Sequence, residues 1–206
     1  MNSDDNVIYV DYSILSTVST CEEKARLAYF RHLRPITEAA PLVFGGAFHA
    51  GVAQFYTSTT RKRSFEEAVE DAKLAFLKDV KERGGDSLPL SADNDERRSI
   101  ERAMYLIEGY AQKWKSYDTN WEDVIRPDNN EPYIEMGFSV YFMDWKGVPV
   151  VLVGKIDRLR RYRVDVGLYT FETKKTGGSV KNYSNKTRPN QQLTGYIYTS
   201  CFNILE

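Results

Sequence analysis

The stretch "GKIDRLRRYRVDVGLYTFETKKTGG", residues 154–178, decides the fold that the sequence predicts. Apolar and polar residues alternate on both sides of a turn near Val164 and Asp165, which is typical of two antiparallel strands. If the turn is centred on these residues, Asp157 lies directly across from Glu172, with Cβ atoms about 5 Å apart. Lys174 shares a face with Glu172 because side chains alternate along a strand. The register therefore predicts a cluster of Asp157, Glu172 and Lys174 at a strand end.

This predicted cluster has two interpretations. Two carboxylates are hard oxygen ligands of the kind that Mg²⁺ or Mn²⁺ requires, and a lysine beside them can orient water and offset charge on a phosphoryl group. Alternatively, the three residues form a cross-strand ion-pair network, worth about 0–1 kcal/mol if exposed. A register shift of one residue would scatter them to opposite faces. The spacing taken alone favours the ion-pair network.

The segments around this stretch predict a mixed α/β fold. "PYIEMGFSVYF" (132–142) and "VPVVLVGKIDRLRRY" (148–162) read as strands, so that three consecutive strands form an antiparallel meander. Upstream, Ser64 and Glu67 form a capping-box pattern before a helix. Its apolar stripe comprises Ala68, Val69, Ala72, Phe76 and Val80. A second helix has a stripe of the same period, formed by Ile100, Ala103, Met104, Ile107, Tyr110, Ala111 and Trp114.

Three further segments carry helical patterns. "DYSILSTVSTCEEKARLAYFRHLRP" (11–35) predicts an amphipathic helix, with Ser13 and Ser16 as cap candidates. A helix entered through Gly45 and Gly46 carries His49 on an apolar face, where a lone histidine is more often a core residue than a ligand. After Pro189, Gln192 and Tyr196 stand four apart on one helix face, a spacing that any amphipathic helix can show.

Composition limits the class of protein. The chain has 206 residues, 42% of them hydrophobic, and a net charge of −1, which fits one globular domain. Residues 154–190 contain ten basic and three acidic residues, a local net of +7. This run is either a phosphate-binding face or the solvated rim of a hairpin. Two distant cysteines, no hydrophobic signal core and no bilayer-length apolar run predict a soluble, cytoplasmic protein.

Together these segments resemble the PD-(D/E)XK nuclease superfamily, specifically its RecB-like branch of recombination, CRISPR-associated and phage nucleases. The resemblance covers most of the chain. Residues 11–35 look like the N-terminal helix of the family, and "FGGAFHAG" (44–51) is similar to its glycine-then-histidine segment. "EMGFSV" (135–140) resembles the first core strand, "GKIDRL" (154–159) the Gly-x-Ile-Asp motif, "FETKKTG" (171–177) the Asp/Glu-x-Lys motif and "QQLTGY" (191–196) the Gln-x-x-x-Tyr motif. Each is weak alone, but their order is a strong signal.

Carried over position by position, the resemblance implies a restriction-endonuclease-like core with a helical insertion at about residues 61–121. It implies that a divalent metal, Mg²⁺ or Mn²⁺, is bound by His49, Asp157, Glu172 and the backbone carbonyl of Thr173. Lys174 would be the catalytic lysine, acting with Asp157 and Glu172. The implied DNA contacts come from Lys175, Gln192 and Tyr196. Glu135 matches a core-strand acid whose role varies, which makes it a weak candidate.

Three departures from the family pattern qualify these expectations. Glu172 stands where the family often has Asp. Cys21 occupies the position of the early cysteine of iron–sulfur members, but no late cysteine triplet follows, so we expect no iron–sulfur cluster. Relatives usually continue past the Gln-x-x-x-Tyr helix, and the end at Glu206 therefore suggests a C-terminally truncated chain.

The expected function is metal-dependent hydrolysis of DNA phosphodiester bonds. We expect an exonuclease that acts on single strands or duplex ends in recombination, repair or phage DNA processing, within a larger complex. The alternative is a nucleic-acid-binding subunit that keeps the fold without cutting. The set of Asp157, Glu172 and Lys174 argues against it, because a domain that does not cut has no chemical need for all three. A structural or interaction protein would require every motif to be a coincidence.

Overall fold

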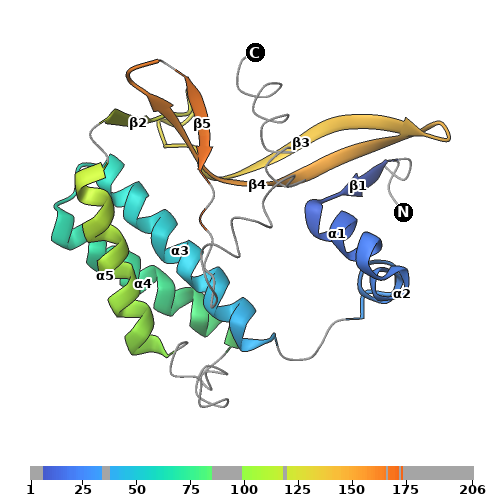
Figure 1. Ribbon diagram of the computed structural model, residues 1–206, viewed down its shortest axis with the longest axis horizontal. Helices are drawn as coiled ribbons and strands as arrows, with labels where there is room; N and C mark the ends of the chain where they lie inside the picture. The colour runs from blue at the N-terminus through green and yellow to red at the C-terminus, as the bar shows by residue number, and fades with distance from the viewer. Residues whose placement is uncertain are drawn as a thin grey trace. The chain divides into compact units, whose positions relative to one another are not determined.

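The computed structural model describes residues 7–33, 38–84, 99–117, 120–165, 167–171 and 173 (Figure 1). The chain divides into two units. The first comprises Met1–Pro35, Met136–Ile156 and Gly178–Glu206, and the second comprises Ile36–Glu135 and Asp157–Gly177. Among the described helices, none has both the length and the apolar character that a membrane crossing requires.

One long strand, β4 (Val148–Tyr162), organises the sheet. Each of the other four strands of the five-stranded sheet pairs with it: β1 (Ile8–Val10), β2 (Trp121–Asp123), β3 (Ile134–Trp145) and β5 (Leu168–Phe171). β1 runs parallel to β4, whereas β2 and β5 run antiparallel to it. Lys146 and Gly147 join β3 to β4 with positive φ angles of 52° and 80°, the backbone of a tight hairpin turn. The predicted mixed sheet with three consecutive strands is confirmed.

The register between β4 and β5 follows the predicted turn. The pairs run from Arg158 opposite Phe171 to Arg161 opposite Leu168. This is the register that a turn centred on Val164 and Asp165 produces. The predicted pair of Asp157 and Glu172 would be the next in this register, but Glu172 lies outside the described residues.

Three helices build the core of the second unit: α3 (Ala40–Thr60), α4 (Phe65–Gly84) and α5 (Ile100–Tyr117). The predicted stripe of α4 is buried in full, at 0–7% exposure. Ser64 and Glu67 form the predicted capping box, in which the Ser64 N–H donates to Glu67 Oε2 at 3.0 Å and the Glu67 N–H donates to Ser64 Oγ at 3.2 Å.

Gly51 sets how closely α3 approaches its neighbours. A Cβ atom at this position would lie 3.0 Å from the carbonyl oxygen of Ala72 in α4 and 3.3 Å from Cδ1 of Ile107 in α5. The first of these contacts is to a backbone atom, which cannot rotate away. Glycine therefore lets the three helices pack together at this level.

Three local predictions were wrong. In the described part of the first unit, a short strand, β1, precedes helix α1 (Tyr12–Thr20), which is capped by Asp11 and not by Ser13 or Ser16. Asp11 Oδ1 accepts a hydrogen bond of 2.7 Å from the Ile14 N–H. The predicted single helix is broken at Cys21, whose backbone is extended. Finally, α3 starts at Ala40, with proline in its first turn, so that Gly45 and Gly46 lie inside it.

Candidate metal centre and its pocket

Asp157 belongs to the part of β4 that lies in the second unit. Its Oδ2 accepts a hydrogen bond of 2.7 Å from the backbone N–H of Thr173, just after β5. This bond holds the carboxylate of Asp157 in one orientation. The predicted role of Thr173 used its carbonyl oxygen, whereas the observed contact with Asp157 uses its N–H.

His49 reaches the same carboxylate from α3. Its Nδ1 atom lies 3.4 Å from Asp157 Oδ2, and the side chains are 27% and 16% exposed. Its neighbours Ala47, Phe48 and Val52 are buried and anchor this part of the helix. His49 is therefore a partly exposed side chain that faces a carboxylate. It is not enclosed in an apolar core.

Glu135 completes the group from the beginning of β3. Its backbone φ angle is +48°, in the left-handed region that non-glycine residues rarely adopt. Such a conformation costs on the order of 1–3 kcal/mol and persists where the surrounding structure holds it. A strained backbone at a polar residue is a feature that clusters at functional sites.

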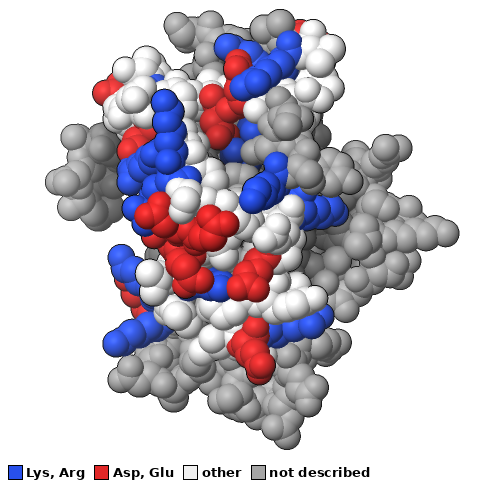
Figure 2. All heavy atoms as spheres, turned by 90° about the vertical axis from the view of Figure 1, so that its left-hand side faces the viewer, with Lys and Arg blue, Asp and Glu red and all other residues white. Residues whose placement is uncertain are grey.

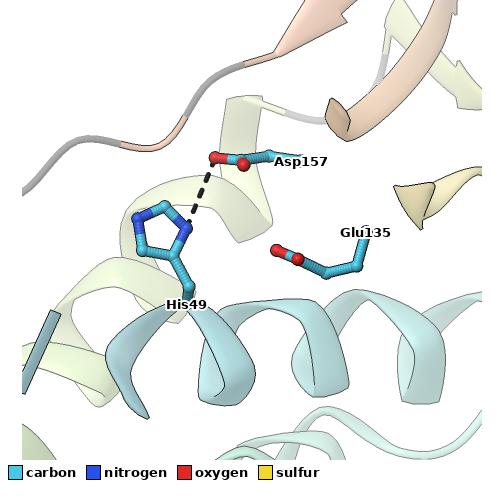
Figure 3. A group of neighbouring side chains, drawn as sticks. All are labelled: His49, Glu135 and Asp157. Atoms are coloured by element: carbon cyan, nitrogen blue, oxygen red, sulfur yellow. Dashed lines mark ion pairs between the residues drawn. The ribbon is translucent and has the colours of Figure 1, made fainter. Parts of the chain in front are cut away.

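The three side chains converge on a common point, as Figure 3 shows. One ligand atom from each of His49, Glu135 and Asp157 can be chosen so that all three lie within 4.8 Å of one another. Two ligands of one ion at about 2.1 Å are at most about 4.2 Å apart, so a small adjustment would bring all three into a single coordination sphere. Two carboxylate oxygens and an imidazole nitrogen are groups that bind divalent metal ions in proteins.

A pocket of about 190 Å³ opens beside this group. His49, Glu135, Asp157 and Thr173 contribute its polar lining. Four aromatic residues supply much of the remaining wall: Tyr56, Tyr110, Trp114 and Phe171. The pocket thus joins a metal-ligating group to a set of flat apolar surfaces.

A buried cation, Arg158, also lines the pocket. It is 4% exposed and donates to Asp123 through Nε at 2.7 Å and through Nη2 at 2.9 Å. Its guanidinium carbon lies 3.3 Å from the centroid of the Tyr56 ring. The bidentate ion pair and the stacked ring compensate the cost of burying this charge.

The described arginines of the predicted basic run contact acidic residues, whereas Lys174, Lys175, Lys181, Lys186 and Arg188 lie outside the described residues. Within the predicted run, Arg158 and Arg160 are buried beside Asp123, and Arg161 and Arg163 lie 3.7 Å and 3.6 Å from Glu122. Figure 2 shows basic and acidic side chains interspersed on the face that it draws. For these four arginines, a structural role describes the observed contacts better than a phosphate-binding face.

Five of the predicted site residues, Glu172, Lys174, Lys175, Gln192 and Tyr196, lie outside the described residues. The structure brings together His49, Asp157 and the weak candidate Glu135, with Thr173 in contact with Asp157. No pattern in the sequence marked Arg158 as a residue of the pocket. Tyr110 and Trp114 were predicted as part of a core stripe. The sequence signal that could have identified them as pocket residues was the presence of two aromatic residues at the end of that stripe.

A comparison of the sequence with known families identifies a match. The family model of the PD-(D/E)XK nuclease superfamily matches residues 11–201. The mixed α/β fold with its five-stranded sheet is consistent with the restriction-endonuclease-like architecture expected from the sequence. A search of curated proteins finds no match to the chain.

Proposed function

Because the chain belongs to the PD-(D/E)XK nuclease superfamily, we propose that it is a Mg²⁺- or Mn²⁺-dependent deoxyribonuclease with its metal centre at His49 and Asp157. Membership of this family indicates a metal-dependent nuclease. The observation that carries the proposal is the convergence of His49, Glu135 and Asp157 beside one pocket. These residues come from α3, β3 and β4, and an ordinary surface ion pair would not need three elements to meet.

Each residue has a proposed task. His49 and Asp157 bind the ion, with Glu172 and the carbonyl of Thr173 as further ligands from the resemblance and Glu135 as a ligand supported by its proximity. A divalent ion bound there supplies positive charge that activates water and stabilises the phosphoryl group during hydrolysis. The Thr173 N–H holds the Asp157 carboxylate in one orientation. Lys174 is the proposed catalytic lysine, which positions the attacking water and offsets developing negative charge.

Several finer points belong to the same proposal. The ordered motifs in the sequence support the RecB-like branch, and with it DNA as substrate, exonuclease action and a role in recombination, repair or phage DNA processing. Lys175, Gln192 and Tyr196 are the proposed DNA contacts. A cytoplasmic location and membership of a larger complex complete the proposal, and both rest on the sequence alone.

The test is a cleavage assay on single-stranded and duplex DNA with free or blocked ends, in Mg²⁺, in Mn²⁺ and in chelator. We expect cleavage only with the ion, and we expect its loss in Asp157→Asn. Binding of Mn²⁺, measured by calorimetry, should weaken about tenfold or more in His49→Gln. DNA binding without metal-dependent cleavage would instead support the non-cutting alternative.

The chain offers a matched control for the histidine. His32 is its only other histidine and is exposed, in the first unit. His32→Gln should leave both cleavage and Mn²⁺ binding unchanged. If His49→Gln lowered the melting temperature but left the Mn²⁺ affinity intact, His49 would be a structural residue and not a ligand.

A further inference from the structure

The aromatic wall of the pocket has a chemical use that metal binding does not explain. Tyr110 and Trp114 are four residues apart on α5 and therefore lie on one helix face. Their ring centroids are 6.0 Å apart, with 48° between the ring planes. Both side chains are half-buried, and both line the same pocket as His49 and Asp157.

These two rings differ from the fully buried residues of the stripe on α5. Ala103, Ile107 and Ala111 are 0–2% exposed and close the core. Tyr110 and Trp114 stand where the helix passes from the core to the pocket wall, so they present flat apolar surface next to charged groups. Aromatic rings in such places stack on nucleobases, and this stacking tolerates every base because each has a π-face.

The wall is held in place from α3. The hydroxyl groups of Tyr56 and Tyr110 share a hydrogen bond of 2.8 Å, and the two rings meet edge to face. Tyr56 itself is 5% exposed and stacks against Arg158. A residue braced in this way loses little entropy when a ligand binds, so Tyr110 is pre-organised for stacking.

The pocket volume suits a single flat ring system. Sites for drug-sized ligands measure about 300–1,000 Å³. The volume of about 190 Å³ here is smaller, and it is shared by the aromatic wall and the metal-ligating group. A nucleotide whose phosphate lies at that group has one base close by, and the aromatic wall offers that base a surface.

We propose that Tyr110 and Trp114 form a subsite for the nucleobase next to the scissile phosphate, so that the substrate is a DNA strand with an unpaired base at this position. This inference rests on the proposed nuclease function. A base inside a duplex is already stacked and paired, and it reaches such a wall only when it leaves the helix. The preferred substrate is then a single strand, or a duplex end that has opened.

The test measures binding, in chelator, by fluorescence anisotropy of a labelled single-stranded oligonucleotide. Trp114→Ala should weaken binding between about fivefold and about a hundredfold, as expected for the loss of one stacked base. Trp114→Phe keeps an aromatic face and should stay within about threefold of the wild type. Trp145→Ala, on the exposed end of β3, is the matched control and should bind like the wild type.

A second measurement uses the wild-type fold and removes the base instead of the ring. A single abasic residue is moved along the oligonucleotide. At one position, the abasic residue should weaken binding to the wild-type protein about as much as the Trp114→Ala substitution does. At that same position, it should not further weaken binding to the Trp114→Ala protein. Equal losses in wild type and Trp114→Ala at every position would overturn the subsite, as would equal affinity of the wild type for a closed duplex and a single strand.

The outcomes separate this inference from the nuclease proposal. If the effect of Trp114→Ala on binding depended on one base, but the protein showed no metal-dependent cleavage, the proposed base subsite would stand and the proposed nuclease function would fall. If the protein cleaved DNA in a metal-dependent way, but the effect of Trp114→Ala did not depend on any one base, the nuclease function would stand and the base subsite would fall.

Discussion

Helices α4 and α5 pack in the same unit and carry apolar stripes of the same period, yet the two stripes end differently. The stripe of α4 is buried from Ala68 to Val80. Of the α5 stripe, Ala103, Ile107 and Ala111 are buried, whereas the two aromatic residues at its end, Tyr110 and Trp114, are half-buried and lie in the wall of a pocket. Periodicity identifies the face of a helix that is turned inward. It does not say whether that face meets a core or a ligand site.

The largest expected effect is on stability, at Phe76. This α4 residue is 0% exposed, and its ring meets Phe44 edge to face at 5.7 Å. Phe76→Ala should lower the free energy of unfolding by about 3–5 kcal/mol, because a cavity remains where the ring was. Trp114→Ala should cost no more than about 2 kcal/mol, since its ring is already in contact with solvent. Urea denaturation would measure both losses of stability, provided that the free energy of unfolding depends on urea concentration with the same slope in each variant and in the wild type.

Leu77 is the control for this pair of substitutions. It follows Phe76 in α4 but is 39% exposed, so Leu77→Ala should change stability by no more than about 0.5 kcal/mol. If Trp114→Ala lowered the free energy of unfolding as much as Phe76→Ala does, the stripes of α4 and α5 would both be core stripes along their whole length. Trp114 would then be a core residue.

A smaller effect is expected where α3 meets both helices. Gly51→Ala gains about 1 kcal/mol of helix propensity but forces a Cβ against the Ala72 carbonyl oxygen, at an overpacking cost of about 1–3 kcal/mol. We expect a net loss of about 1 kcal/mol, measured by thermal unfolding. Gly109→Ala in α5 is the counterpart, because a Cβ there meets nothing within 4 Å. It should stabilise the protein by about 0.5–1 kcal/mol.

The smallest expected effect concerns the starts of the two helices. Ser64 and Glu67 cap α4 in both directions, and the hydrogen bonds from Ser64 hold the pKa of Glu67 below its ordinary value. At α5, Ser99 Oγ accepts from the Arg102 N–H at 3.1 Å, but Arg102 stands where a capping box has an acid. Arg102→Glu should therefore stabilise the protein by about 0.5 kcal/mol at neutral pH.

This gain has a definite pH dependence. A carboxylate that is hydrogen-bonded in the folded state has a lowered folded pKa, so its stabilisation is present above the unfolded pKa and is lost as pH falls through the folded pKa. Thermal unfolding of Arg102→Glu at neutral and acidic pH measures the difference. A gain that is the same at both would contradict the capping explanation.

The sequence predicted the elements whose rules are local. The capping box at Ser64, the stripe from Ala68 to Val80 and the register around Val164 all follow from residues that are near one another in the chain. The break at Cys21 and the start of α3 at Ala40 were missed, because both depend on competition between weak signals.

The candidate site was harder to predict for a different reason. The register of two strands predicted Asp157, but its pairing with His49 came from a resemblance, and the structure brings the two within 3.4 Å through packing that no local pattern encodes. The burial of Arg158 depends on Asp123, 35 residues earlier in the chain. The left-handed backbone of Glu135 leaves no signal in the sequence, since its neighbours read as an ordinary strand.

That backbone has a consequence for how the protein can evolve. Glycine or asparagine would adopt a φ angle of +48° at lower cost than glutamate does, so selection for stability alone would replace Glu135. A benefit from its carboxylate would oppose that replacement. Among homologues, glutamate at this position should persist with His49 and Asp157, and lineages that have lost either partner should drift to glycine or asparagine. A single strained residue would thus record whether the ancestors of each chain were still under selection to use the site.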